Sequence, residues 1–323
     1  MKKFTQQITS VLLFALIFGS AFAQGTATKP IRIILPYSAG GMIDAVPRVI
    51  AEKFTQMYGQ PIIIEARPGA NGNIATEYVK NSPPDGLTWL VSATAMVANP
   101  WLYGDKLKWN PLTDFSGIAA VVWVPPVFAV PASLPVNTLK EFVSYAKANP
   151  GLPFANPSTG SSYHLAAVIF MQVAGIDMNP IGYKGISQAL PDLISGEVKF
   201  SAMAANLTAQ HVKTGRLKVL ATISKTRSKE LPNVPTLIEE GYPAATVVPW
   251  YMLLAPSGTP KDIVAKFNEQ ITKVMAQPDV IEKLEKLGGQ LIEPMKPTEI
   301  DALIRSDYER WGPVIQRAKL KAE

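Results

Sequence analysis

The chain has 323 residues, no cysteine and a formal net charge of +6. Its lysines and arginines are scattered and form no run of about five or six, the pattern that nucleic-acid grooves and membrane-binding patches use. The lack of cysteine excludes disulfides and the lipid-modified cysteine of a bacterial lipoprotein. We therefore expect no nucleic-acid partner and no lipid anchor.

The first residues have the pattern of a secretory signal peptide. Lys2 and Lys3 precede the apolar stretch 11–18, and Ala21-Phe22-Ala23 follows as a small-residue cleavage site. We expect residues 1–23 to be removed, which lowers Lys+Arg from 31 to 29 against 25 Asp+Glu and leaves a net charge of about +4. The sequence predicts a periplasmic protein whose mild positive field suits an anionic small molecule.

An apolar strand, 31–35, opens the mature chain and runs into a turn with two glycines. Apolar residues at helical spacing predict an amphipathic helix over 42–57. Gly40 and Gly41 let the backbone approach a ligand, and Ser38 adds a hydroxyl, so the N–H groups at the helix start are suited to bind an anion. An ordinary strand-to-helix turn is the alternative reading of these residues.

The start of this helix carries charged side chains with two readings. Asp44 is expected to cap or brace the turn, and contact with a ligand amine is the alternative. With Asp44 at or near the N-cap, Pro47 falls in the first turn, where its missing N–H costs no helical hydrogen bond. Arg48 is expected to form a structural ion pair and not to clamp a carboxylate.

Strands at 61–65 and 87–92 alternate with helices after the first unit. The order strand, helix, strand, helix, strand predicts a parallel sheet, and ligands bind beyond the carboxyl ends of such strands. Ser92 and Thr94 lie at one such end, so we expect them beside Ser38.

The stretch 115–130 is too long for one strand and too rich in proline for a helix, so we expect it to pass between two lobes. A second strand-to-helix turn follows at 154–164, with Gly160 among small hydroxyl residues. If each lobe supplies one turn, a ligand with two acidic groups would be held at both ends. A capping box at 236–239 predicts another helix start, and the strand 250–255 is expected to cross back.

The pair Ser162 and His164 raises the alternative of a secreted hydrolase that uses a serine and a histidine in the same cleft. No third orienting group and no G-x-S-x-G elbow accompany this pair. The chain has 2 histidines and no cysteine, which leaves little for zinc, and no phosphate-binding motif. We predict no catalytic residue, no metal and no cofactor. His164 would either donate to a carboxylate or pack behind the site.

Several segments, in order along the chain, resemble the substrate-binding receptors of tripartite tricarboxylate transporters, often called Bug-type receptors. These segments are 36–44 with Arg48, 67–74, 84–86, 183–185, 231–236, 240–242 and 250–251 with 255–260. The resemblance implies an α/β fold of the two-lobe periplasmic binding protein type (type II, Venus flytrap), each lobe a mixed, mainly parallel sheet flanked by helices. Lobe I would comprise residues 30–124 and 250–323, and lobe II residues 125–249. The function implied is that of a monomeric receptor, not an enzyme, which delivers a carboxylate to membrane permease subunits.

The resemblance also implies which residues touch the ligand. Met42 stands where the family commonly has a proline or small polar residue, and 93–96 is more apolar than usual. Both departures shift the expected ligand towards a carboxylate with a hydrophobic or aromatic body. The candidate ligand-binding residues are Ser38, Ala39, Gly40, Gly41, Met42, Asp44, Ser92, Thr94, Ser158, Gly160, Ser161, Ser162, His164, Tyr183 and Asn206.

Overall fold

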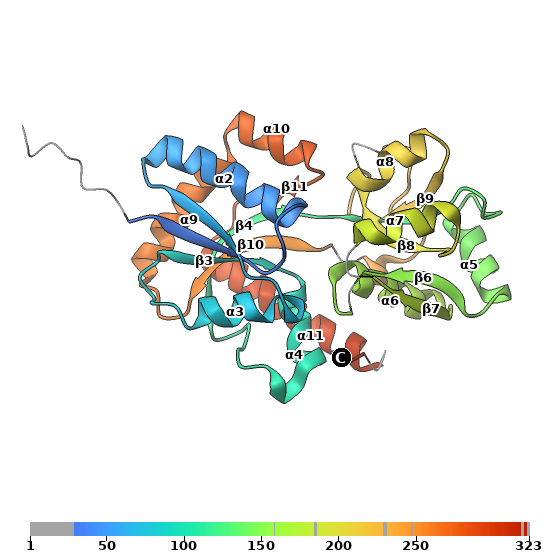
Figure 1. Ribbon diagram of the computed structural model, residues 1–323, viewed down its shortest axis with the longest axis horizontal. Helices are drawn as coiled ribbons and strands as arrows, with labels where there is room; N and C mark the ends of the chain where they lie inside the picture. The colour runs from blue at the N-terminus through green and yellow to red at the C-terminus, as the bar shows by residue number, and fades with distance from the viewer. Residues whose placement is uncertain are drawn as a thin grey trace, which may run out of the picture.

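The computed structural model describes residues 29–157, 159–183, 186–228, 231–246, 248–317 and 320–321. The expected signal peptide, 1–23, lies outside these residues. Within them, no helix has both the length and the apolar character needed to cross a membrane. Figure 1 shows the elements gathered into two bodies that lie side by side.

The first body is built on a six-stranded sheet in the order β11-β4-β10-β3-β1-β2. Strand β1 pairs in parallel with β2 and β3, whereas β10 runs antiparallel to β3 and β4. The alternation of strands and helices therefore gives the parallel part of the sheet, as predicted. The strands are β1 (Ile31–Leu35), β2 (Ile62–Ala66), β3 (Thr88–Ala93), β4 (Phe115–Trp123), β10 (Trp250–Pro256) and β11 (Gln290–Leu291).

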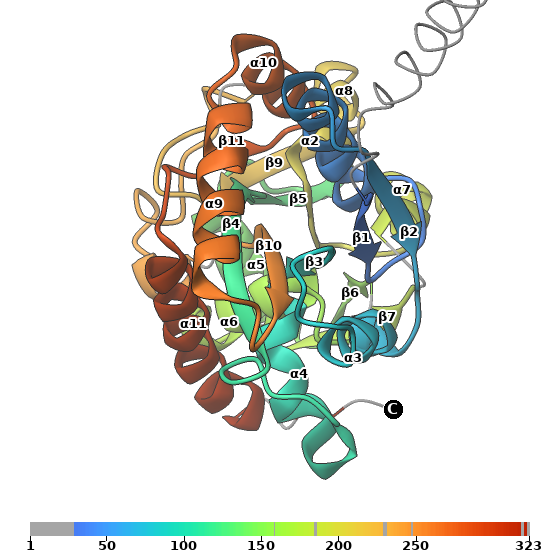
Figure 2. The same cartoon turned by 90° about the vertical axis from the view of Figure 1, so that its left-hand side faces the viewer.

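Helices cover both faces of this sheet, because the side chains of a strand point alternately to opposite faces. Ile33 packs with α2 on one face, and Ile34 packs with α3 on the other. Figure 2 shows α2 and α10 above the strands and α3 and α4 below them. The helices are α2 (Met42–Tyr58), α3 (Asn73–Lys80), α4 (Ala95–Tyr103), α9 (Lys261–Met275), α10 (Pro278–Lys286) and α11 (Pro297–Arg317), with the short helices η1 (Ala70–Gly72) and η2 (Gly104–Lys106).

The second body repeats this plan on a smaller scale. Its strands form the sheet β8-β5-β9 and the pair β6-β7, and a parallel bridge between Phe154 and Phe200 joins the two. Strand β5 lies between β8 and β9 and runs antiparallel to both. Strand β10 lies in the same way between β3 and β4 in the first body. The elements are β5 (Pro126–Pro131), α5 (Leu139–Ala148), β6 (Leu152–Asn156), α6 (Ser162–Ala174), β7 (Met178–Gly182), α7 (Ile186–Ser195), β8 (Ser201–Ala204), α8 (Ala205–Lys213), β9 (Leu217–Thr222) and η3 (Pro243–Ala245).

The chain passes between the bodies twice, and the two passages lie together. Strand β4 leads through Val124 and Pro125 into β5, and the second passage leads into β10. The N–H of Val124 donates to the carbonyl of Pro249 at 2.7 Å, which joins the two passages. The segment 115–130 thus leads from the first body into the second, and the chain returns directly before β10.

One expectation about α2 is wrong. The N-cap is Gly41, so Asp44 is the third residue of the helix and not its cap. Pro47 therefore lies inside the helix and not in its first turn. Proline has no N–H, so the carbonyl of Ile43 receives no helical hydrogen bond from that position.

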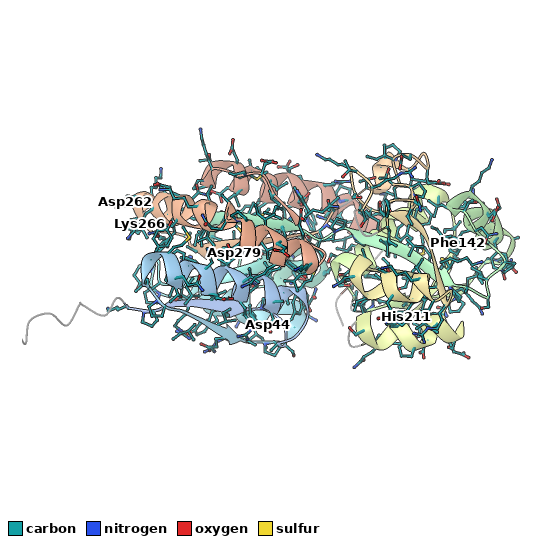
Figure 3. All side chains as sticks on the ribbon, turned by 90° about the horizontal axis from the view of Figure 1, so that it is seen from above. Asp44, Phe142, His211, Asp262, Lys266 and Asp279 are labelled. Carbon is teal, nitrogen blue, oxygen red and sulfur yellow. The ribbon has the colours of Figure 1, made fainter. Side chains whose placement is uncertain are left out.

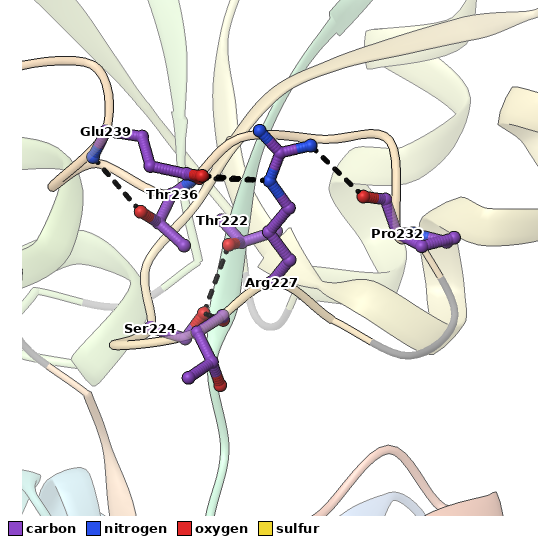
Figure 4. Close-up of polar contacts among 7 residues, drawn as sticks. Thr222, Ser224, Arg227, Pro232, Thr236 and Glu239 are labelled. Atoms are coloured by element: carbon purple, nitrogen blue, oxygen red, sulfur yellow. Dashed lines mark hydrogen bonds and ion pairs between the residues drawn. The ribbon is translucent and has the colours of Figure 1, made fainter.

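The predicted capping box at 236–239 forms, but it caps a turn and not a helix. The N–H of Glu239 donates to Thr236 Oγ1 at 3.1 Å, and the N–H of Thr236 donates to the Glu239 carboxylate at 2.7 Å. Figure 4 shows this pair with Arg227, which forms an ion pair with Glu239. The reciprocal bonds define a local turn, and the sequence after it does not sustain a helix.

Candidate functional site

The turn between β1 and α2 exposes bare backbone. Gly40 has φ 95° and Gly41 has φ 87°, a region that residues with side chains rarely adopt. A Cβ added at either glycine would meet no atom within 4 Å. Residues 38–41 are all exposed. The space above this turn is therefore open to a ligand.

Three consecutive N–H groups at this turn are available to an anion. Among the described residues, none accepts a hydrogen bond from the N–H of Gly41, Met42 or Ile43. The N–H of Gly40 is already used, because it donates to Asp44 Oδ2 at 3.1 Å. The positive end of the helix dipole lies at the same place. The N–H groups that this turn leaves unpaired are therefore those of residues 41–43, one position later than the glycine pair suggested.

Asp44 braces the turn. Its second carboxylate oxygen accepts a hydrogen bond from Arg48 Nε at 2.8 Å, and the side chain is largely buried. The hydrogen bond from Arg48 holds the pKa of Asp44 below its usual value, helped by the Gly40 N–H and opposed by desolvation. Figure 3 shows Asp44 on α2, towards the second body. The expected structural ion pair of Arg48 is confirmed.

Replacing Asp44 with alanine is expected to lower the free energy of unfolding by about 1 kcal/mol, because a charge-assisted bond at a helix start is lost. Urea titration measures this change. Glu269→Ala is the control, since Glu269 forms a fully exposed pair with Lys273 at the same spacing. A loss from the control as large as that from Asp44→Ala would contradict the bracing role.

Ser92 and Thr94 are buried, and their hydroxyls already have partners within the protein. Ser92 Oγ donates to Met96 Sδ at 2.9 Å, and Thr94 Oγ1 accepts from the N–H of Trp250 at 3.1 Å. Ser92 also lines a small pocket beside the first turn, together with Tyr37. Thr94 connects α4 to the start of the crossing strand.

The second turn is braced by His164. The backbone N–H of His164 donates to Ser161 Oγ at 3.3 Å, and the ring Nδ1 accepts from the backbone N–H of Gly160 at 3.2 Å. The side chain is 2% exposed, and burial lowers its pKa to about 4. The imidazole is therefore neutral at pH 7, with its proton on Nε2. Among the described residues, none accepts from the N–H of Ser162 or Tyr163, and Ser158 lies outside them.

Among the contacts between the bodies, one lies beside the second turn and one lies at α8. A Cβ on Gly160 would overlap Leu102 Cδ1 and lie 3.3 Å from Asn71 Nδ2, both in the first body. At the other contact, Asn206 Nδ2 donates to the carbonyl of Leu287 at 3.1 Å. The predicted ligand residue Asn206 therefore uses one of its two amide hydrogens in a bond to the opposite body.

Tyr183 lies half-buried at the end of β7, and its hydroxyl donates to Asp192 Oδ2 at 2.7 Å. Burial and this carboxylate raise the pKa of Tyr183 to about 12. Its hydroxyl hydrogen is thus already used inside the second body, which leaves the ring for any contact with a ligand.

Three tyrosines that sequence reasoning did not single out lie close together. Burial raises the pKa of Tyr251 well above its usual range, and the nearby phenols of Tyr163 and Tyr37 add to this rise. The three come from β10, from α6 and from the first turn, yet their phenols are neighbours. The hydroxyls of Tyr163 and Tyr251 have no hydrogen-bond partner in the described part of the chain, so both are free to donate. The sequence signal for them is weak: each tyrosine lies near the end or the start of a strand or helix.

The sequence and the fold both have counterparts among known proteins. The family described as the tripartite tricarboxylate transporter family receptor matches residues 46–320. The chain belongs to this family. Protein BugT of Bordetella pertussis is 32% identical over 297 residues, which cover 91% of this chain and 91% of BugT.

Solved structures agree with this assignment. An R. palustris protein solved with adipate is 28% identical, with a TM-score of 0.82, over 93% of this chain and 100% of that chain. MatC from Rhodopseudomonas palustris, solved with malate, is 28% identical, with a TM-score of 0.78, over 89% of this chain and 99% of MatC. The predicted fold class is confirmed: a mixed α/β periplasmic binding protein.

The members of its family and its structural neighbours are substrate-binding receptors. This receptor is likewise a substrate-binding protein and not an enzyme. The geometry agrees with this. The hydrolase alternative requires the Ser162 hydroxyl to donate to an imidazole nitrogen of His164. Among the described residues no such hydrogen bond forms, and His164 Nδ1 instead accepts from the N–H of Gly160. Receptors of this family are periplasmic, bind small carboxylates and work with transporter components.

A wider groove lies between the bodies, away from both turns. It is lined by Arg227 from the second body and by Glu282 and Lys286 of α10, among others. None of the predicted ligand residues lines it. Its charged side chains are of both signs, whereas the two turns offer unpaired N–H groups.

Proposed function

We propose that the receptor captures an organic acid between the turns at 38–43 and 160–163 and delivers it to the permease subunits of its transporter. The observation that carries this proposal is the pair of helix starts with unpaired backbone N–H groups, one in each body. The contact of Gly160 with Leu102 and Asn71 brings the second turn against the first body. Adipate and malate in two structural relatives support a carboxylate as the ligand.

Recognition by backbone N–H groups and phenols suits a carrier that must release its cargo. Neither turn contains lysine or arginine in the described residues 36–44 and 159–164. Such hydrogen bonds hold an anion only while water is excluded, so separation of the bodies would free it. An affinity near micromolar corresponds to about 8 kcal/mol.

The two passages of the chain between the bodies suggest where each lobe begins and ends. We propose that residues 30–124 with 250–323 form lobe I and residues 125–249 form lobe II, and that the receptor works as a monomer whose lobes close on the acid. The paired passages at Val124 and Pro249 would be the hinge. The proposed ligands are dicarboxylates, tricarboxylates or aromatic acids. The apolar side chain of Met42 and the ring of Tyr251 favour an acid with an apolar body.

A thermal-shift screen of the mature protein against mono-, di- and tricarboxylates, aromatic acids and amino acids tests this function. An acid that binds only the folded form at about 100 times its Kd adds about 2.7 kcal/mol of stability, which raises Tm. Calorimetry on each hit is expected to show one site and no chemical change of the acid. A screen without any carboxylate hit, or release of a product, would contradict the proposal.

A further inference from the structure

A set of hydrogen bonds beside the first turn fixes the direction in which one phenol points its hydrogen. Tyr37 follows β1, Asn71 lies in η1, and Asn99 lies in α4. All three line the same small pocket, together with Ser92 and Met96. Asn99 is only 1% exposed, so its amide must find its partners within the protein.

The orientation of the Asn99 amide is settled by a backbone carbonyl. Its Nδ2 lies 3.0 Å from the carbonyl oxygen of Asn71 and 2.6 Å from Asn73 Oδ1. A carbonyl oxygen can only accept, so the group facing it must be the nitrogen of Asn99. Asn99 Oδ1 therefore faces Asn71 Nδ2, which donates to it at 2.8 Å.

The same logic then fixes Tyr37. With Nδ2 turned to Asn99, the side chain of Asn71 presents Oδ1 to the Tyr37 hydroxyl at 3.2 Å. An amide oxygen only accepts, so Tyr37 donates its single hydrogen to Asn71. The phenol oxygen keeps only lone pairs for any other group in the pocket. Burial raises the pKa of Tyr37 far above its usual range, so the phenol remains protonated at neutral pH.

We infer that Tyr37 is a specificity-determining residue that accepts a hydrogen bond from the ligand, so that the receptor selects hydroxy acids over the same acids without the hydroxyl. This inference rests on the proposed function. A second carboxylate at this place would meet lone pairs and be repelled, whereas a hydroxyl donates to them.

Matched pairs of acids test this inference in calorimetry on the full mature chain. The pairs are succinate and malate, adipate and 2-hydroxyadipate, and benzoate and 3-hydroxybenzoate. For the acids that bind, the hydroxy form is expected to bind at least about tenfold more tightly, or about 1.4 kcal/mol. Tyr37→Phe is expected to reduce this preference to about twofold or less and to change the affinity for the plain acid by about twofold at most.

A second variant separates the direction of the hydrogen bond from the presence of the phenol. Asn99→Leu keeps the Tyr37 hydroxyl but frees the Asn71 amide to turn, so the hydroxy-acid preference is expected to fall several-fold. Tyr58→Phe is the matched control, because Tyr58 lies at the far end of α2 with its hydroxyl 3.5 Å from the carbonyl of Gln270. This control is expected to keep the wild-type preference.

The outcomes separate the two proposals. Equal affinities within every pair that binds, or a preference that survives Tyr37→Phe, would overturn the role of Tyr37 and leave the receptor function standing. If no acid of the pairs or of the wider screen binds, the proposed function is contradicted, and the inference falls with it.

Discussion

Gly41→Val is expected to weaken carboxylate binding by at least about 100-fold, or about 2.7 kcal/mol, while the fold remains intact. At φ 87° and ψ 179°, Gly41 has a backbone conformation that a β-branched residue cannot hold without strain. Relief of that strain turns the N–H groups of residues 41–43 away from the acid. A valine side chain would also fill the open space above the turn, where no atom now lies within 4 Å of the Cβ position.

Gly59→Val is the matched control for this experiment. Gly59 ends the same helix, has φ 67° and also has no atom within 4 Å of its Cβ position. Its valine variant also places a β-branched residue at positive φ, so it measures the stability cost of such a substitution without touching the turn. Calorimetry with the best acid from the screen and circular dichroism compare the two. Retained affinity in a folded Gly41→Val protein would remove the first turn from the site.

Acidification from pH 6.5 to pH 4 is expected to cost the wild-type protein roughly 3 kcal/mol of unfolding free energy through His164 alone. The buried imidazole has a pKa of about 4 in the folded protein, whereas an unfolded histidine titrates near 6.5. In this window the unfolded chain binds the proton and the folded protein does not. The unfolded state is therefore favoured progressively as pH falls. The contribution of the neutral His164 to the free energy of unfolding is fully present only above about pH 6.5.

His164→Gln isolates this effect, because glutamine does not titrate. The unfolding free energy of the wild type minus that of the variant is expected to fall by roughly 3 kcal/mol between pH 6.5 and pH 4 in urea titrations. His211→Gln keeps His164 and replaces the other histidine, labelled on α8 in Figure 3, so it should keep the wild-type slope. A difference that does not change with pH would show that His164 is not buried in its neutral form.

The sequence alone was sufficient for the elements that depend on local pattern. The buried strand 31–35, the glycine pair and the helix after it were predicted because periodicity and glycine are local signals. The ion pair of Arg48 with Asp44 follows from their spacing on one helix. Pro47 was misplaced because the cap was assigned to Asp44, whereas Gly41 alone fits the dihedral angles at that point.

The parts that sequence reasoning missed depend on tertiary contacts. Tyr251 meets Tyr163 and Tyr37 only because β10 crosses back beside the first turn. The partner of Asn206 is a carbonyl 81 residues later in the chain, which no local pattern reveals. His164 was left open between a ligand contact and a packed residue, and its burial against the Gly160 turn supports the second reading.

A crystal structure of the mature protein with the acid that the screen selects tests the central claim most directly. The expected result is a carboxylate within about 3 Å of the N–H groups at residues 41–43, with the acid enclosed between this turn and the start of α6. An acid found instead in the groove beside Arg227 and Lys286, held by their charges, would contradict the account.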